Sequence, residues 1–141
     1  MKKSVQTISL FLGVSMFAFG ALKFINPFKF WYTTQVVSSE LPFEQFSYWT
    51  GQLGEIASGL IFILLVFFGK KKPHTRHRSV FTMTNISVIV MMLVAIYVHL
   101  HPNVPHEVLP LKIKLPVIPL FFLIFAIINI WLNEKSHNSS H

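Results

Sequence analysis

No cysteine occurs among the 141 residues of this chain, and only five residues are acidic. The absence of cysteine excludes disulfide bonds, thiolate catalysis and metal centres built on cysteine ligands. A redox role would therefore need a cofactor or a partner protein. Charged residues make up only 12% of the chain, whereas 52% are hydrophobic. This composition and length favour one membrane-embedded domain, spanning residues 1–141.

The few charged residues are mostly basic, and their positions indicate what they contact. Twelve Lys and Arg residues give a formal net charge of +7. The densest basic run, residues 70–78, lies between two long apolar stretches rather than on a surface exposed to water. Such a position is typical of a membrane boundary, so we expect a lipid bilayer and not nucleic acid as the partner of these residues.

Four apolar stretches are long enough to cross a bilayer, whose hydrocarbon core requires about 20 helical residues. We place the four helices at about residues 5–25, 51–69, 80–98 and 116–132. The last stretch is the shortest, and Pro116 and Pro119 fall in its first turn, where a missing N–H is tolerated. The sequence therefore predicts an all-α fold, an integral membrane four-helix bundle.

Lys and Arg residues are divided unequally between the two ends of this predicted bundle. Eight lie on the side that holds both termini and the 70–79 loop, and four lie on the other side. Because positive flanks are retained on the cytoplasmic face, both termini are predicted to be cytoplasmic, in an inner or plasma membrane.

The first apolar stretch has an alternative interpretation. A basic start, an apolar run and the segment Ala18-Phe19-Gly20 also resemble a signal peptide with its cleavage site. Cleavage there would leave three helices. The apolar run continues to Ile25, however, and is long enough to span, which favours a transmembrane helix.

The first outer loop, residues 26–50, is unusually aromatic. Aromatic rings favour the headgroup level of a membrane, so this segment is predicted to lie along the outer interface, partly helical around 29–38 and again from 43. A lid over a lipid-soluble ligand is the alternative. The aromatic residues are Phe28, Phe30, Trp31, Tyr32, Phe43, Phe46, Tyr48 and Trp49.

Two ionisable residues fall inside predicted spans, where such groups are costly and often functional. Lys23 lies near the outer end of the first helix, and Glu55 lies near the outer end of the second. The two helices are antiparallel, so an ion pair between these residues would offset the cost of removing both charges from water. Gln52, one turn before Glu55, is a candidate third member. The alternatives are a lysine extended to the interface and a glutamate that complements a helix N-terminus.

Three histidines follow on the same outer side. His99 and His101 end the third predicted helix, and His106 precedes Glu107. We include His99 and His101 with Lys23, Gln52 and Glu55 in a candidate pocket for a ligand or for proton handling. A wet interfacial loop is the alternative, and the spacing implies no ligand geometry, so no metal site is assigned.

Small residues predict where helices approach closely. Ser9 and Gly13 in the first helix, and Gly54 and Ser58 in the second, form faces of the small-xxx-small type. The cytoplasmic halves offer Asn85, Ser87 and Asn129, for which interhelical hydrogen bonds are a simpler role than chemistry. The glycines assigned to helix packing are Gly13, Gly20, Gly51, Gly54 and Gly59.

The segments Gly20–Phe24 and Gly51–Leu60, which flank the aromatic loop, resemble the DoxX-like family of small four-helix membrane proteins. The family pattern is roughly Gly-x-x-Lys-Phe followed by Gly-x-x-Glu-Ile-x-x-Gly. It places Gly20, Lys23, Gly51, Glu55 and Gly59 at matching positions, and the second half of the chain matches less closely. Some members of this family are linked with quinone-coupled sulfur oxidation or redox-stress complexes.

The resemblance and the outer polar residues lead to two functional hypotheses. In the first, the chain is a subunit or accessory of a quinone-linked membrane redox system, with a quinone or lipid in the outer pocket and another membrane or redox protein as partner. In the second, it is a non-enzymatic assembly or scaffolding protein. Neither hypothesis makes the chain an enzyme on its own, and a transporter is disfavoured because four short helices without a repeat line no obvious path.

Overall fold

The computed structural model describes residues 2–69 and 74–138. This part of the chain forms α1 (Lys3–Leu22), α2 (Phe28–Ser38), α3 (Glu44–Phe68), α4 (His74–Leu100) and α5 (Val117–Asn138). Two single-turn 3-10 helices, η2 (His106–Val108) and η3 (Pro110–Lys112), lie between α4 and α5. The predicted all-α class is confirmed for these residues, and α2 confirms the predicted helix near 29–38.

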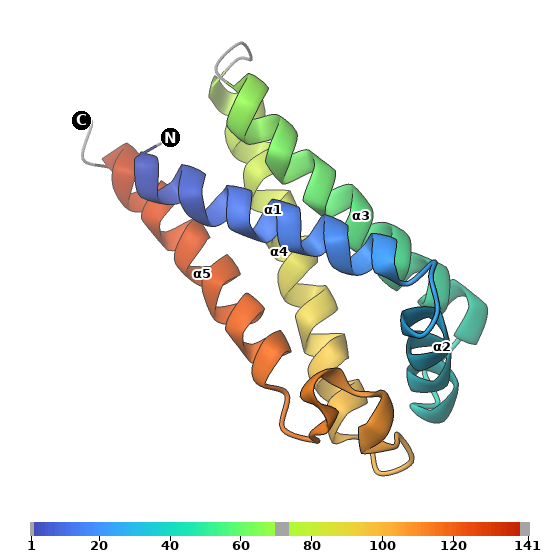
Figure 1. Ribbon diagram of the computed structural model, residues 1–141. Helices are drawn as coiled ribbons and strands as arrows, with labels where there is room; N and C mark the ends of the chain where they lie inside the picture. Colours follow the sequence, from blue (N-terminus) through green and yellow to red (C-terminus); the bar gives the residue numbers. More distant parts are fainter. Residues whose placement is uncertain (1, 70–73, 139–141) are drawn as a thin grey trace.

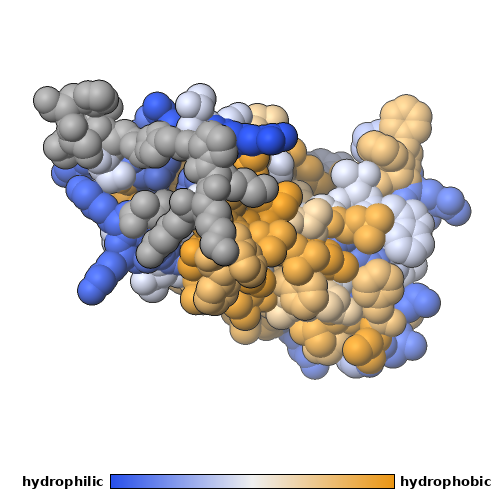
Figure 2. Space-filling model, turned by 90° about the horizontal axis from the view of Figure 1, so that it is seen from above, coloured by the Kyte–Doolittle hydropathy of each residue, from blue (hydrophilic) through white to orange (hydrophobic). Residues whose placement is uncertain are grey.

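Four of the helices are long and apolar enough to cross a membrane: Lys3–Leu22, Glu44–Phe68, Thr75–Leu100 and Val117–Ser136. Their outward faces carry large hydrophobic side chains, such as Leu64, Val90 and Ile124, each at least half exposed. Figure 2 shows hydrophobic residues over the middle of one face and hydrophilic residues toward its two sides. Lipid is the solvent that suits such a surface, so the chain has the architecture of a multi-pass membrane protein.

The helices form two closely packed pairs, α1 with α3 and α4 with α5, and contacts of α3 with α4 and of α1 with α5 close the bundle. Figure 1 places both termini at one end of the bundle, and α2 with the α4–α5 connection at the other. We call these the terminus end and the α2 end. Residues 74–79 of the predicted basic loop form the first turns of α4, and residues 70–73 lie outside the described residues.

The helices differ from the predicted spans mainly at their ends. α3 begins at Glu44 rather than at 51, α4 begins at His74 rather than at 80, and α5 continues to Asn138 rather than ending at 132. Hydropathy marks the stretch that fits in hydrocarbon, whereas polar and aromatic residues can continue a helix beyond that stretch into the interface. α1 ends at Leu22, which leaves Lys23 as its C-cap residue.

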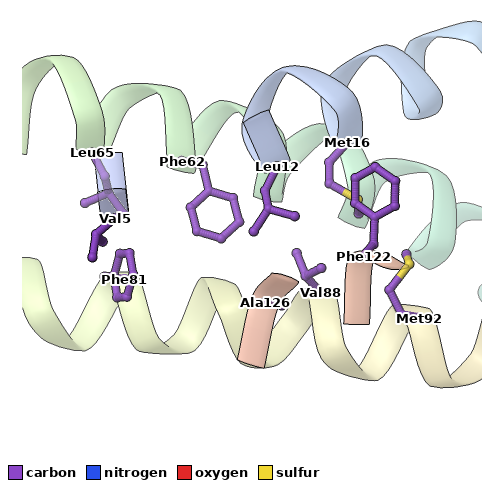
Figure 3. Close-up of a cluster of buried hydrophobic side chains, with 10 residues drawn as sticks. All are labelled: Val5, Leu12, Met16, Phe62, Leu65, Phe81, Val88, Met92, Phe122 and Ala126. Atoms are coloured by element: carbon purple, nitrogen blue, oxygen red, sulfur yellow. The ribbon is translucent and has the colours of Figure 1, made fainter. Parts of the chain in front are cut away.

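A core of buried apolar side chains runs along the bundle axis (Figure 3). Val5, Leu65 and Phe81 lie together at one end of the cluster in this view, and Met16, Met92 and Phe122 lie together at the other. Leu12, Phe62, Val88 and Ala126 lie between these two groups. All four long helices thus contribute to one continuous core.

Glycines set the distance between α1 and α3. A Cβ atom added at Gly59 would lie 2.5 Å from the Phe17 backbone nitrogen, and one added at Gly20 would lie 2.6 Å from Ile56 Cγ1. At Gly13 the nearest atom would be Phe62 Cβ, 3.0 Å away. These three glycines therefore permit a backbone approach that no larger residue would allow, in agreement with the packing role predicted for them.

Buried polar side chains join three helices in the half of the bundle nearer the termini. Asn129 of α5 donates hydrogen bonds to Ser9 Oγ of α1 (3.0 Å) and to Asn85 Oδ1 of α4 (3.1 Å). The predicted interhelical role of Asn85 and Asn129 is thus confirmed. For Ser87 it is wrong, because this exposed hydroxyl donates to the Met83 carbonyl one turn earlier in its own helix.

Candidate functional site

An ion pair connects α1 and α3 at the α2 end. Lys23 Nζ donates to Glu55 Oε1 at 2.7 Å, and the two side chains are only 18% and 13% exposed. Glu55 lies eleven residues after the start of α3, about 16 Å along its axis, so it does not complement that helix N-terminus. The Lys23 ammonium is engaged rather than extended to the interface. The predicted pair therefore forms, and both alternatives are wrong.

Tyr32 of α2 completes this cluster. The Lys23 ammonium lies 4.0 Å from the centroid of the Tyr32 ring, a cation–π distance. The Tyr32 hydroxyl donates to the backbone oxygen of Tyr48 at 2.8 Å, and the two tyrosine rings lie 4.8 Å apart. Burial, followed by the charge of Glu55, raises the pKa of the Tyr32 phenol, which therefore remains a neutral hydrogen-bond donor.

Two cavities adjoin the cluster, one on each side. The first, of about 250 Å³, lies beneath α2 and above the Met16, Met92 and Phe122 group of the core, with further walls from α1 and α5. The second, of about 330 Å³, is lined by α2, the start of α3 and the half of α4 nearer the α2 end. The walls of both cavities are mostly apolar. The residues common to the two cavities are Lys23, Tyr32, Gln35, Glu55, Ala95 and His99, which we call the shared wall.

His99 reaches the shared wall from the last turn of α4. Its side chain is 4% exposed, and its Nδ1 lies 2.9 Å from the Ala95 carbonyl oxygen. A carbonyl oxygen only accepts, so Nδ1 carries the hydrogen and the neutral ring presents Nε2 as an acceptor. A wet loop position, the alternative considered for this residue, does not apply to it.

Gln52 and His101, the other two predicted pocket residues, line neither cavity. Gln52 is 1% exposed and faces α1, where its amide nitrogen lies 3.5 Å from the Gly20 carbonyl oxygen. His101 follows the end of α4 and places its ring 5.5 Å from that of Tyr97. The structure thus brings Lys23, Glu55 and His99 together and separates Gln52 and His101 from the cavities.

The α2 end is held together by contacts that sequence reasoning missed. Gln35 donates to the Val108 carbonyl at 2.5 Å, which ties α2 to η2. Lys114 donates to the His101 carbonyl at 2.6 Å and also to the Val104 carbonyl. A small second apolar cluster of Val98, Val104, Val108 and Leu109 packs with Trp31 and Leu41. These contacts fix α2 as a cover over both cavities.

The aromatic residues of the first loop divide into two groups. Trp31 and Tyr32 face the first cavity, whereas Phe30 and Phe43 are 62% and 83% exposed and line neither cavity. One group therefore borders a cavity and the other is exposed. The interfacial position of this loop, and a lid as its alternative, both stay predictions.

The glycine at position 51 makes room for the tyrosine of the cluster. A Cβ atom at position 51 would overlap the Tyr32 hydroxyl oxygen and would also lie close to Cζ of the same ring. We expect Gly51→Ala to lower stability by about 1–2 kcal/mol in the wild-type chain and by clearly less in a Tyr32→Phe chain, which lacks the hydroxyl. Thermal melting of the four chains measures this coupling, and equal losses in both backgrounds would contradict it.

The three histidines at the α2 end have separate partners. His106 lies 3.3 Å from Glu107, and the His101 Nδ1 accepts from the Asn103 backbone N–H at 3.4 Å. Within residues 2–69 and 74–138, no three His, Asp or Glu side chains are grouped closely enough to hold a metal ion.

Comparisons of this chain with protein-family models, curated proteins and solved structures found no match. The shared wall combines a carboxylate, one oxygen of which has no partner among the described residues, with an imidazole and a neutral phenol, and it lies between two apolar cavities. Such a wall can bind the polar group of a lipid-soluble molecule and can hold or pass a proton.

Proposed function

We propose that this chain is a DoxX-like membrane protein that serves a quinone-linked redox system as a subunit or accessory. Its cavities bind a quinone-type molecule near the outer leaflet of an inner or plasma membrane. Within this proposal the chain acts with a partner rather than as an enzyme on its own. It has no cysteine and hence no thiol chemistry, so the electrons come from another membrane or redox protein. The Lys and Arg distribution supports an outer position for the α2 end.

One observation carries this proposal: the Lys23–Glu55 ion pair borders two apolar cavities. Stability alone does not require a charged pair at such a place. The second oxygen of Glu55, Oε2, is buried and has no hydrogen-bond partner among the described residues. A buried carboxylate oxygen without a partner is unfavourable, and sites of this kind are often functional. The cavities are close in size to the lower end of ligand sites, roughly 300–1,000 Å³.

The walls of the first cavity support entry from the bilayer. They include Phe19 and Leu22 of α1, which are 39% and 36% exposed, and Ile118 and Pro119 of α5. An apolar molecule dissolved in the outer leaflet would pass between α1 and α5 and reach the shared wall without crossing water.

Native mass spectrometry of the gently solubilised protein tests this function. We expect the wild-type chain to retain a quinone-type molecule and Ala95→Phe, which fills the shared wall, to lose it. Ala18→Phe introduces the same ring on an exposed face of α1 and is expected to keep the ligand. Retention of the same ligand by Ala95→Phe, or its absence from the wild-type chain after exposure to a quinone, would overturn the proposal.

Assembly or scaffolding is the second candidate function, and a groove between α3 and α4 favours it. This groove of about 560 Å³ is lined by small residues of α3, including Gly54, Ala57 and Ser58. Small residues permit close approach of another transmembrane helix. A partner chain that is retained by the wild-type protein and lost in Ala57→Phe, with no quinone in either, would favour this second function.

A further inference from the structure

The hydrogen-bond donors of the shared wall are already engaged within the protein. The Tyr32 hydroxyl donates to Tyr48, the Gln35 amide donates to Val108, and the His99 Nδ1–H donates to Ala95. Lys23 donates to Glu55 Oε1, and its ammonium lies over the Tyr32 ring. Each of these donor groups therefore already has an acceptor within the protein, and only the remaining N–H bonds of Lys23 and Gln35 are left for a ligand.

The acceptors of the same wall remain available. Glu55 lines both cavities, and its Oε2 has no partner among the described residues. His99 also lines both, and the bond from its Nδ1 leaves Nε2 as the acceptor of the neutral ring. A buried carboxylate oxygen gains most from a donor, because charge-assisted hydrogen bonds are the stronger ones.

This imbalance distinguishes the two oxidation states of a quinone. A quinone presents only carbonyl oxygens, which would face the lone pairs of Glu55 without an intervening hydrogen. A quinol presents two O–H groups on the same ring and with the same apolar tail. The apolar walls make the same contacts with the ring and tail of both oxidation states. A difference in affinity between quinol and quinone therefore depends on Glu55 and His99.

We propose that the shared wall selects a lipid-soluble hydrogen-bond donor, a quinol or related phenol, over the oxidised carbonyl form, with Glu55 Oε2 as the principal acceptor. This inference rests on the proposed quinone-linked function. It assigns the site to the reduced member of the pair and makes Glu55 the residue that determines specificity. The ion pair with the Lys23 ammonium favours the ionised form of Glu55, in which both oxygens only accept hydrogen bonds.

A competition experiment separates donor recognition from simple apolar binding. The purified protein in detergent is given equal amounts of a decyl-substituted 1,4-benzoquinol and its 1,4-dimethyl ether, under nitrogen. The ether keeps the ring and the tail but has no O–H group and cannot be oxidised to the quinone directly. Native mass spectrometry then gives the ratio of the two complexes. We expect the quinol complex to exceed the ether complex by at least about tenfold, the value of one charge-assisted hydrogen bond.

Two variants test whether Glu55 causes the preference for the quinol over its ether. Glu55→Met is expected to reduce the ratio to about one, whereas Glu44→Gln, a change of an exposed carboxylate in the first turn of the same helix, should preserve it. If Glu55→Met does not fold, the wild-type ratio alone decides. Equal binding of quinol and ether by the wild-type chain would overturn the inference and leave the proposed function standing, whereas binding of neither would overturn both.

Discussion

Replacement of Gly59 by alanine is expected to lower the melting temperature of the protein by on the order of 10 °C. The added Cβ would lie 2.5 Å from the Phe17 nitrogen and 2.7 Å from the Gly13 oxygen. Both are backbone atoms of α1 and cannot rotate away, so α1 and α3 must separate along their contact. Overpacking of this kind costs about 1–3 kcal/mol, which outweighs the better helix propensity of alanine. Circular dichroism of the purified protein during heating measures the change.

Gly54 provides the matched control for this prediction, because it belongs to the same helix. A Cβ there would lie 3.0 Å from the Met91 sulfur, near the far end of a flexible side chain that can move. We expect Gly54→Ala to melt within about 2 °C of the wild-type chain. A wild-type melting temperature for Gly59→Ala would show that α1 and α3 do not approach as closely as described.

The helical bundle could be predicted because its main determinant is local. A run of apolar residues long enough to cross a bilayer must satisfy its backbone within a helix, whatever its neighbours are. The Lys23–Glu55 pair was also predictable, since antiparallel neighbouring helices place residues of similar depth side by side. Depth along a helix can be read from the sequence alone.

The side of a helix that faces the bundle interior cannot be predicted from the sequence in this way when lipid surrounds the bundle. Gln52 and Glu55 differ by only one turn, yet Gln52 faces Gly20 and Glu55 faces the cavities. In an amphipathic helix a polar face would settle the direction, but α3 is apolar on nearly all sides.

The contributions of Tyr32 and Gln35 were missed for a different reason. They act through contacts that are distant in the sequence, such as that of Gln35 with Val108, and nothing in the sequence of an aromatic loop specifies them. The aromatic composition was the available signal. It predicted an interfacial segment, with a lid as the alternative, and did not identify which ring faces inward.

The largest loss of stability is expected when the Lys23–Glu55 pair is broken from one side. Lys23→Met removes the ammonium and leaves the Glu55 carboxylate buried with neither oxygen paired. Removing one partner of a buried ion pair costs about 3–5 kcal/mol, whereas replacing both by apolar residues is often close to neutral. We therefore expect Lys23→Met to melt well below the wild-type chain, and Lys23→Met/Glu55→Met to recover most of the difference.

The second ion pair shows why burial, rather than charge alone, decides this result. Arg78 of α4 pairs with Glu134 of α5 at the terminus end, and these side chains are 48% and 37% exposed. Water and ions screen such a pair, so Arg78→Met is expected to change stability by less than about 1 kcal/mol. Comparable losses for Lys23→Met and Arg78→Met would contradict the buried environment of Glu55. Recovery in the double variant would instead show that the pair is not needed for folding, a result that agrees with the role in ligand recognition proposed for Glu55.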